Sequence, residues 1–239
     1  MLEPIIIKRL NRKEGITVSM LKAIHGVIRR MHKPYGKFSF VSRLKKDAAI
    51  LDVGCGNNSP FWVKQIVPNC HYTGIDIGDC NQTLPNMADR YIITAPEEFT
   101  PEIAKNANSF DAVISSHNLE HCNDREGTLQ AMLDSLKSGG LLYLSFPSEK
   151  SVHFPKRGGT LCYYDDATHR DLPPDFNAVV DVVKRNGFDV IFAAACYQPI
   201  LDWCLGMLTE SRSRRENRVR RGTRAYYGFD AVIWARKRG

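Results

Sequence analysis

Residues 50–58, with the sequence ILDVGCGNN, are the stretch that decides the fold of this chain. A short apolar run ends in Asp52, and two glycines one residue apart, Gly54 and Gly56, follow it. Glycine has no Cβ and tolerates positive φ, so a buried parallel strand that opens into a ligand-binding loop is typically spelled in this way. A helix that begins soon after such a loop directs its free N–H groups at the same place. The stretch therefore predicts a βαβ unit that lets a ligand approach its backbone.

The next expected strand ends in a carboxylate at the right distance. Residues 71–77, HYTGIDI, place Asp76 at the tip of that strand. In nucleotide-binding βαβ units, a carboxylate about 20 residues past the glycines accepts hydrogen bonds from ribose hydroxyls. A dinucleotide-binding loop would carry a third glycine, whereas this loop has Asn58 near that place, and the charge of Asp52 suits a cationic ligand better than a pyrophosphate.

Two later stretches carry a family resemblance. Together with residues 50–58 and Asp76, the sequences FDAVISSHNLEH at 110–121 and LKSGGLLYLS at 136–145 resemble the ordered motifs of class I S-adenosylmethionine-dependent methyltransferases. Ser138 stands where that family usually has proline. The resemblance covers about residues 45–195, is closest to the type 11 methyltransferase-like members, and extends more weakly to bacterial enzymes that modify sugars and polysaccharides. It implies the cofactor and the reaction type but says little about the acceptor.

The order of expected elements agrees with that resemblance. Near-continuously apolar strands that alternate with helices predict an α/β fold with a mostly parallel sheet covered on both faces. The resemblance implies a Rossmann-like sheet of seven strands with the last strand antiparallel. Strands are expected at 48–53, 72–77, 91–93, 110–116, 140–146, 188–195 and 227–236, and helices at 15–33, 60–67, 125–137 and 173–186.

The chain is expected to form a single methyltransferase domain, residues 1–239. Its expected parts are a helical extension or lid at 1–47, a cofactor-binding core at 48–195, two substrate-side insertions at 147–172 and 196–226, and the last strand at 227–239. Ligands of open α/β sheets bind beyond the carboxyl ends of the strands, which is where the first insertion begins.

The resemblance also implies roles for individual residues in binding S-adenosylmethionine. The glycine loop, including Cys55 as a small apolar filler, would line the methionine end, and Asp52 would interact with the amino group. Asp76 would bind the ribose, and Ile77 would pack on the adenine. The remaining cofactor-binding candidates are Ala95, Pro96, Ser116 and His117.

The reaction implied is direct displacement of the methyl group by an oxygen, nitrogen or carbon nucleophile. A hydroxyl acceptor would benefit from a general base, and histidine suits that role near neutral pH. His169 and His117 are the catalytic candidates, whereas His121 and Glu120 are interpreted as structural. The substrate-binding candidates are Asn118, Tyr163, Tyr164, Asp165, Asp166 and Arg170.

The mixed loop at 158–170 has a plainer interpretation, in which an aspartate caps a turn and Arg170 pairs with a carboxylate. A divalent metal on Asp165, Asp166 and His169 is disfavoured, because adjacent aspartates point different ways in most backbones. No metal is therefore expected.

Composition and cysteine content limit the classes of protein that this chain could belong to. The chain has 239 residues, 43% hydrophobic and 25% charged, which is ordinary for a globular protein. No stretch has the roughly 18–20 apolar residues of a membrane span, no signal-peptide pattern opens the sequence, and the seven cysteines lack metal spacing, so a cytoplasmic protein with reduced thiols is expected.

The net charge of +7 is concentrated in one segment. The arginines of this segment are Arg212, Arg214, Arg215, Arg218, Arg220, Arg221 and Arg224. They form either a solvated helical face or a site for a phosphate-bearing substrate, an anionic membrane surface or nucleic acid.

The leading hypothesis is methyl transfer to a hydroxyl or amine of a small molecule or glycan, such as a phosphate-bearing sugar. The first alternative is a nucleic-acid methyltransferase that uses the arginine segment. Residues 116–119, SHNL, lack the Asn-Pro-Pro-Tyr type of motif expected of a base-flipping enzyme. The second alternative is a cofactor-binding module without turnover.

Overall fold

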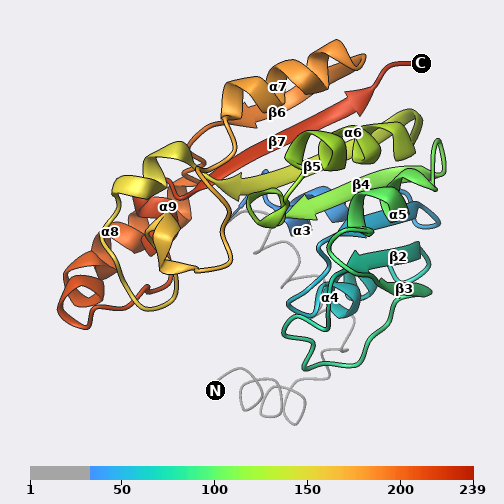
Figure 1. Cartoon of the computed structure of the whole chain (residues 1–239). Helices are drawn as coiled ribbons and strands as arrows, with labels where there is room; N and C mark the ends of the chain where they lie inside the picture. The colour runs from blue at the N-terminus through green and yellow to red at the C-terminus, as the bar shows by residue number, and fades with distance from the viewer. Residues whose placement is uncertain (1–32) are drawn as a thin grey trace, which may run out of the picture.

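The computed structural model describes residues 33–239, and these residues are built around one seven-stranded sheet (Figure 1). The strand order is β3-β2-β1-β4-β5-β7-β6. The strands are β1 (Ala49–Val53), β2 (His71–Asp76), β3 (Arg90–Ile93), β4 (Phe110–Ser116), β5 (Leu136–Pro147), β6 (Phe188–Ala194) and β7 (Asp230–Lys237). The pairs among β1 to β5 are parallel, and β7 runs antiparallel to both β5 and β6. The predicted fold class, including the antiparallel last strand, is confirmed.

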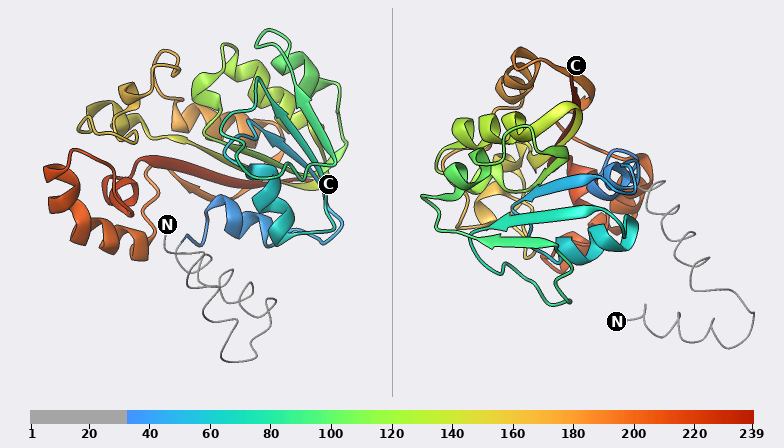
Figure 2. Two further views of the ribbon diagram at one scale, coloured as in Figure 1. Left: turned by 90° about the horizontal axis from the view of Figure 1, so that it is seen from below. Right: turned by 90° about the vertical axis from the view of Figure 1, so that its right-hand side faces the viewer.

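Helices cover both faces of the sheet (Figures 1 and 2). Three lie on one face: α5 (Phe99–Ala104), α6 (Arg125–Ser135) and α7 (Phe176–Arg185). On the other face lie α3 (Lys37–Val41) and α4 (Ser59–Ile66). Successive strand side chains point to opposite faces, so Leu51 joins the core under α5 to α7 and Ile50 joins the core under α3 and α4.

The two segments outside the minimal alternation both lie beyond the carboxyl end of β5 (Figure 1). The first contains the short 3-10 helices η2 (Glu149–His153) and η3 (Tyr163–Asp165). The second forms α8 (Ile200–Arg215) and α9 (Thr223–Tyr227). Glycine at position 206 permits their close packing, because a Cβ there would overlap the carbonyl oxygen of Gly222. A further 3-10 helix, η1 (Leu119–His121), follows β4.

Several expected boundaries differ from the observed ones. The helix expected at 125–137 ends at Ser135, because Leu136 pairs with Phe110 and so belongs to β5. The last strand begins at Asp230 rather than 227, because α9 ends at Gly228, whose φ of 72° suits a glycine C-cap. The short α5 was not expected, and the helix expected at 15–33 lies outside the described residues apart from its last residue.

Among the described residues, no helix combines the length and apolar character that crossing a bilayer requires.

Candidate active site

The loop after β1 is shaped by a close approach of the β4 loop. Gly54 has a φ of 74°, and a Cβ added there would lie 2.6–2.8 Å from the side chain of Asn118. Asn118 is buried and comes from the segment between β4 and η1. Only glycine allows both the backbone conformation and the contact, so the two loops that follow neighbouring parallel strands meet at the same sheet edge.

Asp52 is fully buried and is held by donors from three elements. The ammonium of Lys37, from α3, lies 3.0 Å from its Oδ2, and the hydroxyl of Tyr72 donates to the same oxygen at 2.7 Å. The hydroxyl of Ser59 donates to it as well. A buried carboxylate requires such partners. Lys37 was not predicted from the sequence, because it follows the helix expected at 15–33 and belongs to no motif.

A cleft of about 450 Å³ opens beside this carboxylate, at the carboxyl ends of β1 and β4. Four predicted residues line it: Gly54, Gly56, Ser116 and His117. Arg224 of the predicted arginine segment also lines it. Lining residues that were not predicted include Lys33, Lys37, Tyr143, Tyr197 and Asp230. These come from the N-terminal segment, from β5 and β7 and from the residues after β6, which no local motif connects to the glycine loop.

The predicted ribose and adenine contacts lie at the ends of β2 and β3, beside the cleft. Asp76 is buried, which raises the pKa of its carboxyl, and its Oδ1 accepts a hydrogen bond from the backbone of Ile77 at 2.8 Å. Ile77 itself is 51% exposed, so an apolar surface is available there. Ala95 and Pro96 are also exposed and follow β3. Cys55 is buried, and its pKa is raised by burial, as expected of an apolar filler.

His117 stands between two carboxylates on the wall of the cleft. Its Nδ1 lies 3.1 Å from Glu120 Oε1, and its Nε2 lies 3.2 Å from Asp230 Oδ1. Burial alone would lower the pKa of His117, but hydrogen bonding and charge from Asp230 and Glu120 raise it to about 9. The same pair lowers the pKa of Asp230. Both ring nitrogens of His117 therefore face a carboxylate, which favours the protonated ring at neutral pH.

The loop after β5 uses most of its polar groups internally. Asp165 Oδ2 accepts from the backbone N–H groups of Arg157, Leu161 and Cys162 at 2.9–3.2 Å. Tyr163 is fully buried and donates to the carbonyl of Arg170 at 2.9 Å.

The other candidates of this loop are more exposed. Asp166 accepts from Thr168, and Tyr164 and Arg170 are exposed. The residues that line the cleft include no member of this set, and a substrate-binding role for the loop stays a prediction.

His169 packs against Tyr163, with ring centroids 4.3 Å apart. Its Nδ1 lies 2.6 Å from the carbonyl oxygen of Tyr163, and because a carbonyl only accepts, Nδ1 carries the proton. Burial lowers the pKa of His169, so the ring is neutral at neutral pH. It does not line the cleft, and its role as general base stays a prediction.

The arginine segment is partly neutralised within itself. Arg212 and Arg220 pair with Glu216, and Arg214 lies 3.8 Å from Glu210. Arg224 is the member of the segment that lines the cleft. Its guanidinium donates to the carbonyls of Gly159 and Thr160 at 3.2 and 3.1 Å.

A buried ion pair outside all sequence motifs anchors α8. The guanidinium of Arg157 donates to both oxygens of Glu210, at 2.9 and 2.7 Å, and to the hydroxyl of Ser213 at 2.8 Å. The hydroxyl of Tyr227 completes the cluster at 3.2 Å. The pair joins the loop after β5 to α8 and α9, so it fixes the segment that carries Arg224.

The comparison with known proteins identifies the family. A family model described as a methyltransferase domain matches residues 24–192, well over half of the chain. The chain belongs to this methyltransferase family. Its sheet order and its glycine loop are those of the class I, S-adenosylmethionine-dependent members, as the sequence motifs predicted.

Relatives in sequence and structure agree with this assignment. An uncharacterized protein of Methanocaldococcus jannaschii is 30% identical over 109 residues, which is 43% of this chain but only 29% of that protein. The S-adenosylmethionine-dependent methyltransferase of Mesorhizobium loti superposes with a TM-score of 0.56 at 14% identity, over 84% of this chain and 97% of that one. Phosphoethanolamine N-methyltransferase 2 of Haemonchus contortus, solved with S-adenosylmethionine, gives 0.56 at 14% identity, over 84% of this chain and 51% of that one. At these identities the structures establish the fold.

The residues of this methyltransferase fit the cofactor, S-adenosylmethionine. Gly54 and Gly56 line the cleft, and a Cβ at Gly56 would lie 2.9 Å from the carbonyl oxygen of Cys80 and 3.6 Å from Asp76 Oδ2, so glycine is needed where the loop approaches that carboxylate. Lys37 also lines the cleft, where its ammonium is paired with Asp52.

Proposed function

We propose that this methyltransferase moves the methyl group of S-adenosylmethionine to a hydroxyl or amine of a small-molecule or glycan acceptor that carries an anionic group, such as a phosphate-bearing sugar. The observation that carries the proposal is the charge of the cleft wall opposite the glycine loop. Lys33, Arg224 and His117 line that wall together with Asp230. Even with Glu120 behind His117, the cationic groups outnumber the carboxylates.

The cofactor supplies an activated methyl group on a sulfonium. A lone pair of the acceptor forms the new bond to the methyl carbon, the carbon–sulfur bond breaks with its electrons remaining on sulfur, and the acceptor loses a proton. Because the thioether leaves readily, much of the catalysis is alignment of the acceptor with the methyl carbon. The chain's contribution is therefore to bind and orient the acceptor.

The contacts of His117 favour a positioning role. Both of its nitrogens face carboxylates, at 3.1 and 3.2 Å, so neither has a free lone pair to take the acceptor's proton. It fixes Asp230 at the wall of the cleft and adds a positive charge there. A base role for His169 would need movement of the loop after β5 toward the cleft.

Arg224 is proposed to recognise the anionic group. Its guanidinium lies over the ring of Phe229, 4.8 Å from the centroid, and is held by backbone carbonyls rather than by a carboxylate. Arginine binds phosphate through paired N–H groups, and hydrogen bonds to charged partners contribute about 1.5–3 kcal/mol. Loss of the Arg224 side chain should therefore weaken the binding of an anionic acceptor by roughly tenfold or more.

The test is methyl transfer from isotope-labelled S-adenosylmethionine to a panel of nucleotide-linked sugars, the matching neutral sugars and a short RNA. We expect transfer to a phosphate-bearing sugar, with KM raised by Arg224→Gln and unchanged by Arg221→Gln, whose side chain is exposed. Transfer to neutral sugars alone, or no effect of Arg224→Gln, would refute the anionic-acceptor proposal. Transfer to RNA alone would support the nucleic-acid alternative, and cofactor binding without any transfer would support the non-catalytic one.

A further inference from the structure

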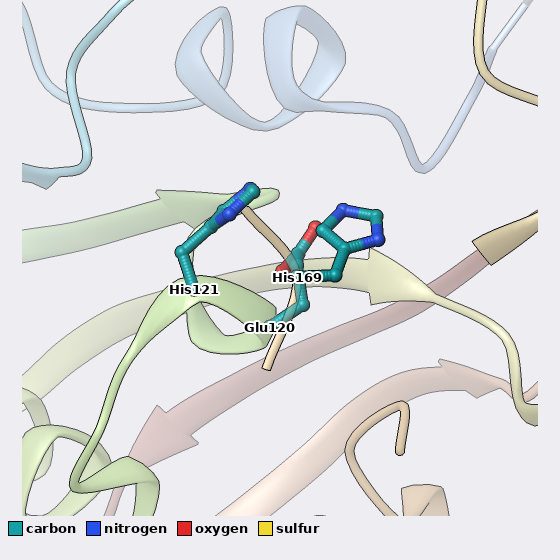
Figure 3. Close-up of side chains that lie close together, drawn as sticks. All are labelled: Glu120, His121 and His169. Atoms are coloured by element: carbon teal, nitrogen blue, oxygen red, sulfur yellow. The ribbon is translucent and has the colours of Figure 1, made fainter. Parts of the chain in front are cut away.

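We propose that Glu120, His121 and His169 form a binding site for a divalent first-row transition-metal ion such as Zn²⁺. One ligand atom from each of the three side chains lies within 4.8 Å of the other two. Figure 3 shows the three side chains converging, with the Glu120 carboxylate between the two imidazole rings in this view. The site lies behind the wall of the cleft and uses no residue that lines it.

The carboxylate of Glu120 is the strongest indication of a missing partner. Glu120 is fully buried, and its Oε1 lies 3.1 Å from His117 Nδ1. Its other oxygen, Oε2, has no hydrogen-bond partner among the described residues. A buried carboxylate oxygen without a partner is costly, and buried charges are normally paired or bound to a metal.

Both histidines use Nδ1 as a hydrogen-bond donor to the surrounding loop. The Nδ1–H of His169 is used by the carbonyl of Tyr163, at 2.6 Å. The hydroxyl of Thr168 donates its own proton to Asp166 Oδ1, at 2.6 Å, so His121 Nδ1, 3.0 Å from that hydroxyl, must be the donor there. In the neutral form of each ring the lone pair is therefore on Nε2, and a hydrogen bond from the other ring nitrogen is typical of metal-ligating histidine.

The donor set selects the class of ion. Two imidazole nitrogens and one carboxylate oxygen suit Zn²⁺, Fe²⁺ or Co²⁺ better than Mg²⁺ or Ca²⁺, which prefer oxygen ligands. Metal–ligand bonds of about 2.0–2.1 Å place tetrahedral ligands about 3.3 Å apart, so the side chains would close by about 1.5 Å at most. Asp166 Oδ2, 4.0 Å from His169 Nε2, is an additional carboxylate oxygen beside the cluster.

The ion would connect two segments that are distant in sequence. Glu120 and His121 belong to η1, whereas His169 belongs to the loop after β5. The proposed role is to hold that loop against the carboxyl end of β4. This assignment replaces the general-base role predicted for His169, because a nitrogen bound to a metal has no free lone pair.

The test is a Co²⁺ titration of the untagged, full-length chain after removal of metal with EDTA, followed by the visible absorption of the bound ion and by competition with Zn²⁺. We expect one Co²⁺ per chain, displaced by Zn²⁺, with affinity lowered about tenfold or more in Glu120→Gln, His121→Ala and His169→Ala. His153→Ala, at an exposed position on η2, is the matched control and should bind as the unmodified chain does.

Two outcomes would overturn the site: no binding by the unmodified chain, or equal binding by the three ligand variants. Glu120→Gln keeps the shape of the side chain, and near-ultraviolet circular dichroism reports whether each variant is folded. The readout requires neither cofactor nor acceptor, so failure of the metal site leaves the proposed methyl transfer intact, and the reverse also holds.

Discussion

Replacing Glu210 with alanine should destabilise the segment that carries Arg224 by about 3–5 kcal/mol, because the change leaves a buried guanidinium without its counter-ion. The side chains of Arg157 and Glu210 are only 3% and 10% exposed, so solvent screens the pair little. Ser213 and Tyr227 still accept from the guanidinium in the variant. We therefore expect the lower end of the range, about 3 kcal/mol.

The assay is urea unfolding followed by tryptophan fluorescence. Trp203 lies in α8, whereas Trp234 lies in the sheet core on β7, so the two report on different regions. If α8 opens before the sheet, a transition from Trp203 should precede the main one in Glu210→Ala. Versions of the chain that keep only Trp203 or only Trp234 would separate the two signals from each other and from that of Trp62 in α4.

Two controls sharpen this prediction. Arg212→Ala removes an ion pair on the same helix whose arginine is 62% exposed, and it should cost at most about 1 kcal/mol. Arg157→Met combined with Glu210→Leu removes both charges, and it should be close to neutral or stabilising. A cost below about 1 kcal/mol for Glu210→Ala would refute the buried pair.

The Arg157–Glu210 pair should also make the stability of the fold depend on pH. The hydrogen bond from Arg157 is the main reason that the pKa of Glu210 is lowered from its ordinary value of 4.5. A carboxyl with a lowered folded-state pKa contributes stability above its unfolded pKa and loses that contribution as the pH falls through the folded value. Stability should therefore decline in acid below about pH 4.5. Glu210→Gln should flatten that part of the profile.

Three further predictions concern the cofactor loops. Asp76→Ala should weaken the binding of S-adenosylmethionine by about tenfold or more, as measured by calorimetry, because the variant loses a carboxylate that accepts hydrogen bonds from the ribose hydroxyls. Gly54→Ala should lower both cofactor affinity and thermal stability, because its Cβ would overlap Asn118 at a φ of 74°. In the folded protein a thiol reagent should modify exposed Cys80 before buried Cys55, whose pKa is raised by burial.

Each of these three predictions has a control or an outcome that would contradict it. Asp47→Ala, at an exposed position before β1, is the control for Asp76→Ala, and equal affinities would remove Asp76 from the cofactor site. Gly139→Ala has a φ of 75° with open space around its Cβ, so it separates backbone strain from the Asn118 overlap. Modification of Cys55 at the rate of Cys80 would mean that the loop opens readily.

The sheet and the placement of the glycine loop could be predicted because their signals are local. A strand, a glycine turn and a carboxylate at a fixed distance follow from backbone geometry, and residues 50–58 and Asp76 lie where such a pattern requires them. The cleft wall could not be predicted in the same way. Lys37 reaches Asp52 from α3, and Asp230 reaches His117 from β7. These contacts depend on how distant segments pack, and no spacing in the sequence encodes that.

The interpretation of Glu120 changes once the fold is known. In the sequence, Glu120 and His121 follow an expected strand and read as structural groups beside a helix. In the fold, Oε1 of the carboxylate lies 3.1 Å from His117 Nδ1 on the cleft wall, and the side chain converges with those of His121 and His169. Glu120 therefore connects the cleft proposed to bind the acceptor with the site proposed to bind a metal ion. If metal binding also changed the KM of the acceptor, with Glu120→Gln abolishing the change, the ion would be coupled to the cleft through this carboxylate; an unchanged KM would leave the ion with its tethering role alone.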